Sequence, residues 1–536
     1  VGRGGATIMA QMTVAAAIGH QEPDDWTRHF ADTVEAGRGL CNEELSSLLC
    51  REGPARIMEL DRWKIGWARE EGHLRQITAP GHSRNRCVYV DYLNSGPAVA
   101  STLQRQVKKL PEIKAISNLA IVEILVDDGR VVGVLGLNVV TGEWVSFRSG
   151  AVILAAGGLS KLYARNSGST NMGGDGYGLG LRVGAELVDM EFVQLFPIAH
   201  LAPRLVGMDP IMWDPFRYKL GGRLLNGRFE EFIERYGSED RGNYRAPRDV
   251  ASYAILKEVE AGRGSAHGGA YLDFRHVPES RLRESFGPVI DRLLGNGIDL
   301  TKMPVEVAPM AHYQMGGLRV NGSLETRISG LFAAGEIVGG ANGANRLSGN
   351  AMTEALVFGE TAGRMAAQAA LKEQKQSSSR IKSWQSLVQD TSRRLESITQ
   401  TGGPRGAPAP VALQAELQQL MSEKVGAFRT EEKLCAALEQ IRKWRQEILP
   451  GMQISPNQPF NMDLQDWFEL RNMLDTAEMV ALAALSRRES RGAHQREDFP
   501  DQDPLWEKNQ VLALEGDVLT IRTEPIVRAP VEGTAA

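Results

Sequence analysis

Two short apolar runs that each end in glycine constrain the fold of this 536-residue chain more than any other feature. AVILAAGG occupies residues 151–158 and GLFAAGE occupies residues 330–336. A solid apolar run of this kind is typical of a parallel strand buried on both faces, and the glycine lets the backbone approach a bulky ligand. A long segment separates the two runs. We therefore expect one α/β domain whose two parts flank an insertion.

The first part, residues 1–194, contains the segment LAIVEILVDDGRVVGVLGLNV, in which the turn Asp127-Asp128-Gly129 divides two apolar halves. This pattern predicts a β-hairpin. Residues 195–305 differ in character, because Pro, Arg and Trp occur in irregular stretches around one helix bounded by Pro247 and Gly262. They predict an inserted α+β domain.

The α/β pattern returns at residues 306–371, with a helix expected from Gly349 to about Lys372. ALQAELQQLMSEKVGAFRT and EEKLCAALEQIRKWRQEIL then space their apolar residues by three and four, which predicts a helical bundle over residues 372–498. The tail, residues 499–536, ends in an alternating segment expected to add a strand.

Composition excludes several classes of function. The 61 Lys and Arg nearly balance the 66 Asp and Glu without a long run of one sign, so we expect no nucleic-acid partner. The four cysteines, Cys41, Cys50, Cys87 and Cys435, show no CxxC spacing and no nearby His cluster, so we expect no metal site in this chain, and any iron-sulfur centre would sit on another chain. No stretch has the apolar length for a membrane span. The small, apolar first residues are followed by no A-x-A-like cleavage site, so we expect the chain to begin inside a domain. We expect a cytoplasmic protein, with any contact to a membrane face made through a partner subunit.

Two local features indicate a ligand that carries a sugar and an anionic group. The stretch SGSTNMGGDGYGLGLRVGAEL contains seven glycines at a helix start, where Thr170, Asp175 and backbone N–H groups would hold an anion. Glu336, directly after the second apolar run, is placed to accept hydrogen bonds from a ribose, as in dinucleotide sites. A flexible loop and ordinary turn chemistry remain the alternatives for each feature alone.

Further polar residues gather around turns in VAPMAHYQMGGLRV and ETRISGLFAAGEIVGGANGANRLSGNAMTEALVFG. Polar side chains beside buried strands need partners, which points to a site. The chain here resembles the FAD-binding flavoproteins of the succinate dehydrogenase, fumarate reductase and L-aspartate oxidase family. DMEFVQLFP, APRDVASYAI, YLDFRHV and ESRGAHQREDFP resemble segments of the same family in the same order, and the last is closer to the dehydrogenases and reductases.

The resemblance implies an α/β fold, with a discontinuous Rossmann-like FAD/NAD(P)-binding domain, an inserted α+β capping domain and a C-terminal helical bundle. It implies FAD as cofactor and an iron-sulfur protein as partner subunit. The cofactor-binding residues that it implies are Gly4, Gly5, Ala6, Thr7, Ala156, Gly157, Gly158, Thr170, Asp175, Gly335, Glu336, Asn345, Arg346, Ser348 and Asn350.

The resemblance also implies catalytic roles. Arg248 occupies the family's proton-transfer position, His312 and Arg346 bind the substrate carboxylate, and Asp214 serves as a proton relay. Arginine suits a carboxylate because its planar fork matches the two oxygens, whereas its proton is normally retained and needs such a relay. From spacing alone, Arg248 is instead expected to cap or salt-bridge a helix start, and His312 to be a core histidine.

Three departures from the family stand out. No GxGxxG turn precedes Val1, so the pyrophosphate-binding start of the domain is either outside this sequence or supplied by another chain. The positions matched to the family's FAD-linked histidine are Gly4 and Gly5, so FAD is expected to be noncovalent. The family's HPTG reads Phe196-Pro197-Ile198-Ala199 and its Thr-Glu pair reads Trp213-Asp214.

Phe196 and Trp213 therefore predict a more apolar substrate pocket, suited to a small substrate with one carboxylate rather than to succinate or fumarate. Three hypotheses follow: an oxidoreductase acting on a C–C bond next to a carboxylate, a flavin electron-transfer subunit whose old site is closed, and an oxidase like L-aspartate oxidase. Arg248, retained together with His312 and Arg346, favours the first, because an electron relay needs no proton donor.

Overall fold

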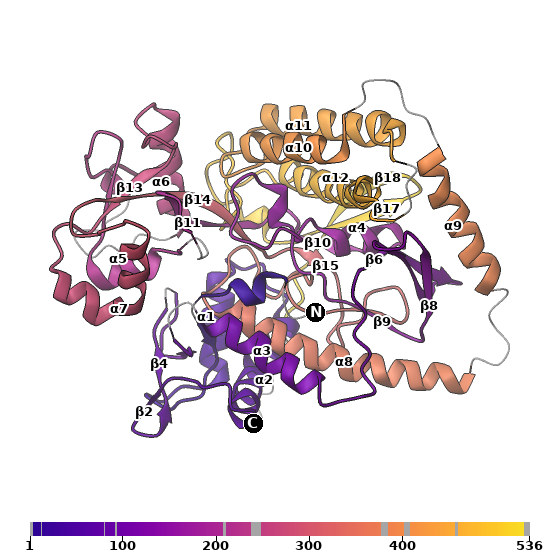
Figure 1. Cartoon of the computed structure of the whole chain (residues 1–536), viewed down its shortest axis with the longest axis horizontal. Helices are drawn as coiled ribbons and strands as arrows, with labels where there is room; N and C mark the ends of the chain where they lie inside the picture. The colour runs from indigo at the N-terminus through magenta and orange to yellow at the C-terminus, as the bar shows by residue number, and fades with distance from the viewer. Residues whose placement is uncertain are drawn as a thin grey trace.

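The computed structural model describes residues 4–11, 13–79, 81–91, 94–206, 211–236, 248–376, 384–400, 408–455 and 459–529. Its body combines the N-terminal part of the chain with the C-terminal helices. The inserted domain projects from one side of that body, at the left of Figure 1, and two long strands connect them. The molecule thus offers a junction between body and insertion where a ligand could lie between two domains.

The first domain joins strands from both sides of the insertion. β9 (Val152–Leu154) and β16 (Leu331–Ala333) run parallel, with Ile153 opposite Phe332, which confirms the two parallel strands and shows that they are neighbours. The expectation that both strands are buried on both faces is wrong for β9, because among the described residues it pairs with β16 alone and Ile153 is 40% exposed. The long helix α8 (Asn350–Gln376) packs against both strands.

The same domain contains a small antiparallel sheet against the other end of α8. Its strands, in the order β1-β5-β4, are β1 (Val14–Ala15), β5 (Cys87–Val88) and β4 (Gln76–Ile77). The remaining elements are the hairpin β2 (Arg69–Glu70) and β3 (His73–Leu74), and the helices α1 (Trp26–Ala36), α2 (Glu43–Arg62), α3 (Ser95–Val107) and α4 (Asp175–Arg182). These elements bury Ile57 and Trp67 in a core that holds the N-terminal strands.

The hairpin predicted before the first apolar run is confirmed. β6 (Leu119–Asp127) pairs with β7 (Arg130–Asn138), and β8 (Trp144–Arg148) adds a third strand. The turn places Asp128 and Gly129 at φ values of 47° and 70°, the left-handed conformation that a two-residue hairpin turn requires.

The inserted domain has its own sheet and core. β11 (Val193–Ala202) and β14 (Val305–Gln314) are the two strands that connect it to the body, so the predicted boundaries at 194 and 305 fall within them. The sheet continues with β13 (Ala270–Asp273) and β12 (Arg223–Leu225), and the helices are α5 (Asp214–Leu220), α6 (Arg248–Glu260) and α7 (Glu279–Gly295). The helix predicted between Pro247 and Gly262 is therefore confirmed as α6.

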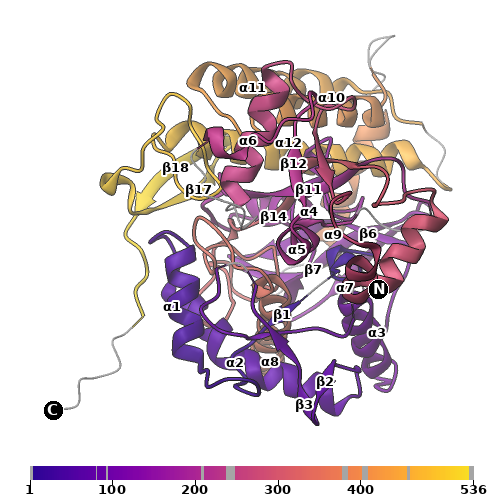
Figure 2. The same cartoon turned by 90° about the vertical axis from the view of Figure 1, so that its left-hand side faces the viewer.

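The C-terminal helices share a core with the first domain instead of forming a separate one. They are α9 (Trp384–Gln400), α10 (Pro410–Lys424), α11 (Glu431–Lys443) and α12 (Met462–Ser486). α12 packs on α4, and one apolar cluster includes Leu187, Leu417 and Met473. Figure 2 shows α10, α11 and α12 as a layer across the top of the body.

The tail contributes two strands where the sequence predicted one. β17 (Asn509–Glu515) and β18 (Val518–Glu524) form an antiparallel hairpin, and β17 also pairs with β10 (Leu187–Val188), which pairs with β15 (Gly317–Leu318). The tail thus returns to the first domain. The alternation of apolar residues in the sequence shows a strand but not the strand it will join.

Candidate active site

A cavity of about 1760 Å³ lies where the parallel strands β9 and β16 end. Residues that follow both strands line it, together with Asp214 of α5 and Ser285–Val289 of α7 in the inserted domain. A pocket for one drug-sized ligand measures about 300–1,000 Å³. This cavity therefore has room for a dinucleotide and a small substrate together.

Glycine and a buried acid shape the end of the cavity next to the strands. Gly157 and Gly335 line it with φ values of 75° and 80°, which residues with a side chain rarely adopt. Glu336 also lines it, and its Oε1 accepts a hydrogen bond of 3.1 Å from the backbone N–H of Gln314. Burial raises the pKa of Glu336 to about 7. A side chain at Gly158 would collide with this carboxyl group, so that glycine makes room for Glu336.

Some of the predicted cofactor-binding residues line the cavity, and others lie outside its lining. The cavity is lined by Gly4, Gly5, Ala6, Thr7, Ala156, Gly157, Gly335, Glu336, Arg346 and Ser348. The remaining ones lie outside that lining and are Gly158, Thr170, Asp175, Asn345 and Asn350.

Three of these outer residues have hydrogen-bond partners elsewhere in the chain. Thr170 is exposed, and Asp175 accepts a 2.7 Å hydrogen bond from Asn472 of α12, which anchors α4 to the helical domain. Asn345 accepts from Gln194 at 2.9 Å. Asn350 is fully buried. Asp175, Asn345 and Asn350 therefore connect neighbouring elements of the fold.

His312 and Arg346 both line the cavity, as the substrate-binding hypothesis requires. Arg346 is 6% exposed; it donates to Gln194 Oε1 at 3.0 Å and to the Leu347 carbonyl at 3.1 Å. Its guanidinium carbon lies 4.3 Å from the centroid of the Tyr313 ring. His312 Nδ1 is 2.8 Å from the hydroxyl oxygen of Ser167, another lining residue. Both side chains are thus oriented by neighbours at the cavity wall.

Phe196 and Asp214 also line the cavity, but Trp213 does not. The Phe196 ring contacts His312 edge to face, with centroids 5.4 Å apart. Trp213 is fully buried in the core of the inserted domain, where its indole N–H donates to His200 Nδ1 at 3.2 Å. His200 is held in the same place and does not replace the family's substrate-binding histidine in the cavity lining.

Arg248, the predicted proton donor, is the first residue of α6. Its side chain lies outside the part of the chain that the structure describes. α6 packs against β11 and β14, the strands that carry Phe196 and His312.

Sequence reasoning did not identify several residues of the site, including Ser167, Gln194, Tyr313 and His82. His82 lines the cavity, and its Nε2 donates to the Ser348 carbonyl at 2.7 Å. Burial, with the charge of Arg86 as a further cause, lowers the pKa of His82 to about 4, so the ring is neutral at neutral pH. Ser167, Gln194 and Tyr313 lie in segments already singled out above, but their partners are distant in sequence, so the sequence assigned them no role; His82 lies in none of those segments.

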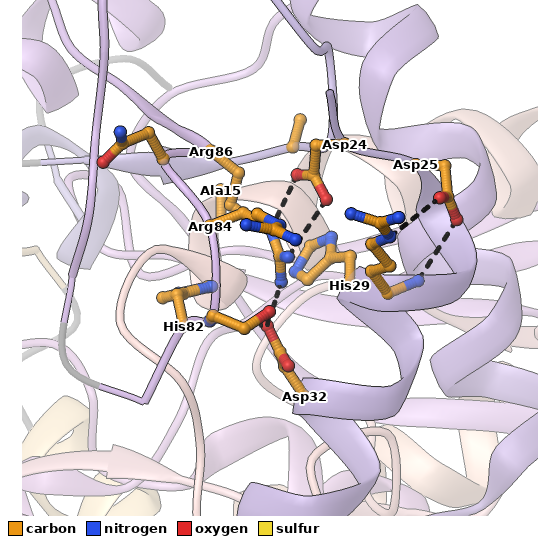
Figure 3. A network of polar contacts seen from close by, with 12 residues as sticks. Ala15, Asp24, Asp25, His29, Asp32, His82, Arg84 and Arg86 are labelled. Atoms are coloured by element: carbon orange, nitrogen blue, oxygen red, sulfur yellow. Dashed lines mark hydrogen bonds and ion pairs between the residues drawn. The ribbon is translucent and has the colours of Figure 1, made fainter. Parts of the chain in front are cut away.

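A buried ion cluster holds the loop that carries His82 (Figure 3). Arg86 donates to both carboxylate oxygens of Asp24, at 3.0 and 3.1 Å, and to Asp32 at 2.6 Å. Asp32 also accepts from the backbone N–H of Ser83 at 2.9 Å. Because Arg86 is fully buried and paired with two carboxylates, it fixes the loop against α1.

Within the described ranges, no group of three or more His, Cys, Asp and Glu side chains is arranged to hold a metal ion. None of the described helices combines the length and apolar character that a bilayer crossing requires.

Two family models match this chain. The FAD binding domain matches residues 1–352, and the fumarate reductase flavoprotein C-terminal domain matches residues 414–534. The chain belongs to the fumarate reductase and succinate dehydrogenase flavoprotein family.

Relatives of this flavoprotein are similar over nearly the whole chain. The matching chain of fumarate reductase (CoM/CoB) from Methanothermobacter marburgensis is 35% identical over 95% of this chain and 90% of its own length. The fumarate reductase flavoprotein subunit of Escherichia coli is 32% identical over 91% of this chain and 82% of its own length. The solved structure of FrdA from E. coli quinol fumarate reductase superposes with a TM-score of 0.88 at 29% identity, covering 99% of this chain and 91% of that one.

FAD is the cofactor of this flavoprotein, and the cavity fits it. Gly157 and Gly335 leave the backbone open to close approach, and the buried Glu336 is an acceptor for ribose hydroxyls. The fold is likewise that of the family: an FAD-binding domain, a capping domain formed by the insertion, and a C-terminal helical domain.

Proposed function

We propose that this flavoprotein reduces or forms a C–C double bond next to a carboxylate, and that its electrons pass to or from an iron-sulfur partner. One observation carries the proposal: Arg346 and His312 line the same cavity as Gly157, Gly335 and Glu336. Arg346 and His312 thus line the same cavity as the residues expected to bind FAD. A substrate carboxylate held by them would lie beside the flavin.

Arg346 binds the substrate carboxylate in this proposal. Its planar guanidinium matches the two carboxylate oxygens, and Gln194 and Tyr313 hold it in place before substrate arrives. His312 adds a hydrogen bond, and its ring is oriented by Ser167. Together they stabilise the enolate-like negative charge that develops on the carboxylate during the reaction.

Arg248 and Asp214 handle the proton. FAD, when bound, supplies the hydride chemistry at one carbon of the C–C bond. In the direction of reduction Arg248 gives a proton to the adjacent carbon, and Asp214, which is 4% exposed and lines the cavity, passes a second proton from water to the arginine; oxidation runs the same path in reverse. Such a relay is needed because a guanidinium normally retains its proton.

The apolar wall of the cavity limits the substrate to one carboxylate. Phe196 and Met212 line it, and with Met310 they form one apolar cluster. A second carboxylate placed against this wall would lose its hydrogen bonds to water without replacement. We infer a 2-enoate with an apolar end, or the corresponding saturated acid, as the substrate.

We also propose that FAD is held without a covalent bond. The positions matched to the family's FAD-linked histidine are Gly4 and Gly5, and both line the cavity. Acid precipitation of the protein is expected to release all flavin into the supernatant. Flavin that remains in the washed pellet would contradict this part of the proposal.

The reaction is tested with FAD-loaded protein and reduced methyl viologen as electron donor. Each double bond consumes two electrons and two protons, so oxidation of the viologen reports turnover. We expect higher kcat/KM for 2-butenoate than for fumarate, and loss of turnover with retained FAD in Arg248→Ala. Full activity of that variant would refute the catalytic proposal, and hydrogen peroxide formation without viologen would favour an oxidase instead.

A further inference from the structure

Behind Arg346 lies a buried chain of polar groups. The hydroxyl of Tyr313, whose ring stacks on Arg346, donates to Glu354 Oε2 at 2.7 Å. The side-chain amide of Asn342 donates to the same oxygen at 2.7 Å. Glu354 is fully buried in α8 and lies outside the cavity lining. It therefore acts on the cavity only through Tyr313 and through its charge.

Four elements bring titratable or charged groups to Glu354. Tyr313 comes from β14, Tyr177 from α4, Glu336 from the turn after β16, and Arg346 from the loop before α8. Burial is the main cause that raises the pKa of both tyrosines well above the usual value, so both are neutral. Arg346 is the cation whose field lowers the pKa of Glu354, and Glu336 is the second acid, which raises it.

We propose that Glu354 is a positioning residue that orients Arg346 through Tyr313 and, by gaining or losing its own proton, sets how tightly the cavity holds a carboxylate. This inference rests on the proposed function, in which Arg346 binds the substrate carboxylate.

The direction of the effect follows from charge. An ionised Glu354 is stabilised by the field of Arg346, and a carboxylate bound to Arg346 cancels that field. Binding of a carboxylate therefore favours the protonated form of Glu354. Burial raises the pKa of Glu354 to about 8, although Tyr313, Asn342 and Arg346 act in the opposite direction. The affinity for a carboxylate thus falls as the pH rises through about 8.

The test is a titration of the FAD-loaded full chain with acetate, which lacks the C–C bond that the reaction needs. Binding is followed by the change in flavin absorbance at several pH values. If bound acetate raises the pKa of Glu354 by one unit, affinity weakens roughly fivefold between about pH 7 and about pH 9. This weakening is expected to disappear in Glu354→Gln. Tyr313→Phe keeps the ring on Arg346 but removes a hydrogen-bond donor to the Glu354 carboxylate. The pKa of Glu354 then rises, so the weakening of acetate binding should begin at higher pH.

Glu360→Gln is the matched control, because it removes one carboxylate from the exposed face of the same helix, where Glu360 pairs with Arg364. Its pH profile should equal that of the unmodified protein. An unchanged profile in Glu354→Gln would overturn the role of Glu354, and Tyr313→Phe decides the matter alone if Glu354→Gln fails to load FAD. Acetate binding that survives Arg346→Gln would refute the proposed function itself, so the two failures are distinguishable.

Discussion

Arg346 and Arg487 are both buried, yet their surroundings differ in kind. Arg487 is fully buried and contacts carboxylates at 2.6 Å from Glu191 and at 3.0 Å from Glu489. Arg346 donates to an amide oxygen and to a backbone carbonyl, and its guanidinium stacks on Tyr313 at the cavity wall.

The difference in surroundings indicates a difference in role. Arg487 follows α12 and joins it to Glu191, next to β11, so its charge is used to hold the helical domain against the first domain. Arg346 donates to Gln194 and to the Leu347 carbonyl, stacks on Tyr313 and lines the cavity. An ion pair saturated by protein stabilises the fold, whereas an oriented arginine in a cavity wall suits recognition of an anion.

Replacement of Arg487 is expected to give the largest effect of the changes that test this contrast. Arg487→Met leaves Glu191 buried without its ion-pair partner, whereas Glu489 keeps Arg491, and we expect a loss of about 3–5 kcal/mol in the free energy of unfolding. Urea unfolding measures it. The neighbouring Arg488→Met is the control, because that side chain is 60% exposed, and it should change stability by less than about 0.5 kcal/mol. Equal effects would show that the buried cluster does not hold the domains together.

Replacement of Arg346 should change catalysis more than stability. We expect Arg346→Gln to lower kcat/KM by about a hundredfold or more, as the loss of one oriented donor to a developing charge does. Arg346→Lys keeps the positive charge but lacks the planar guanidinium, so its kcat/KM should lie between those of the unmodified protein and Arg346→Gln. Steady-state kinetics and urea unfolding on the same samples decide the point. A large loss of stability with unchanged kcat/KM would place Arg346 in the same class as Arg487.

The pH dependence of stability sharpens the contrast further. The pKa of Glu354 is raised to about 8 in the folded protein, so between its unfolded pKa and about 8 the folded state binds more protons. Its contribution therefore makes the free energy of unfolding fall as the pH rises through that window. In Glu354→Gln the free energy of unfolding should fall by about 2 kcal/mol less over this pH window. This value is smaller than the shift in the pKa of Glu354 implies, because proteins relax around a buried charge. Parallel curves for the two proteins from pH 5 to pH 8 would contradict this expectation.

The smallest predicted effect concerns Phe196 in the apolar wall of the cavity. Phe196→His returns the residue type of the family to that position, and kcat/KM for fumarate relative to 2-butenoate should rise about tenfold. Phe229→His, at a 53% exposed phenylalanine of the capping domain, is the control and should leave the ratio unchanged. A ratio that does not move in Phe196→His would mean that this wall does not select the substrate.

Local patterns in the sequence predicted the parts of the fold that depend on local interactions. The two apolar runs, the hairpin around Asp128 and the helix α6 all follow from periodicity and turn residues. The sequence assigned no role to His82, Gln194, Tyr313 or Glu354, although the last three lie in segments that resemble the family, because their partners are distant in sequence. They come together only when α8, β11, β14 and the loop before β5 meet.

Trp213 and Asp214 show the difference between what the sequence determines and what only the tertiary structure determines. By itself the sequence determined the family, the FAD cofactor and the set of residue types at the substrate end. Tertiary structure alone decided that Asp214 lines the cavity while Trp213 enters the core of the capping domain. The physical reason is that successive side chains at a helix start point about 100° apart, so the orientation of α5 determines which one faces the cavity.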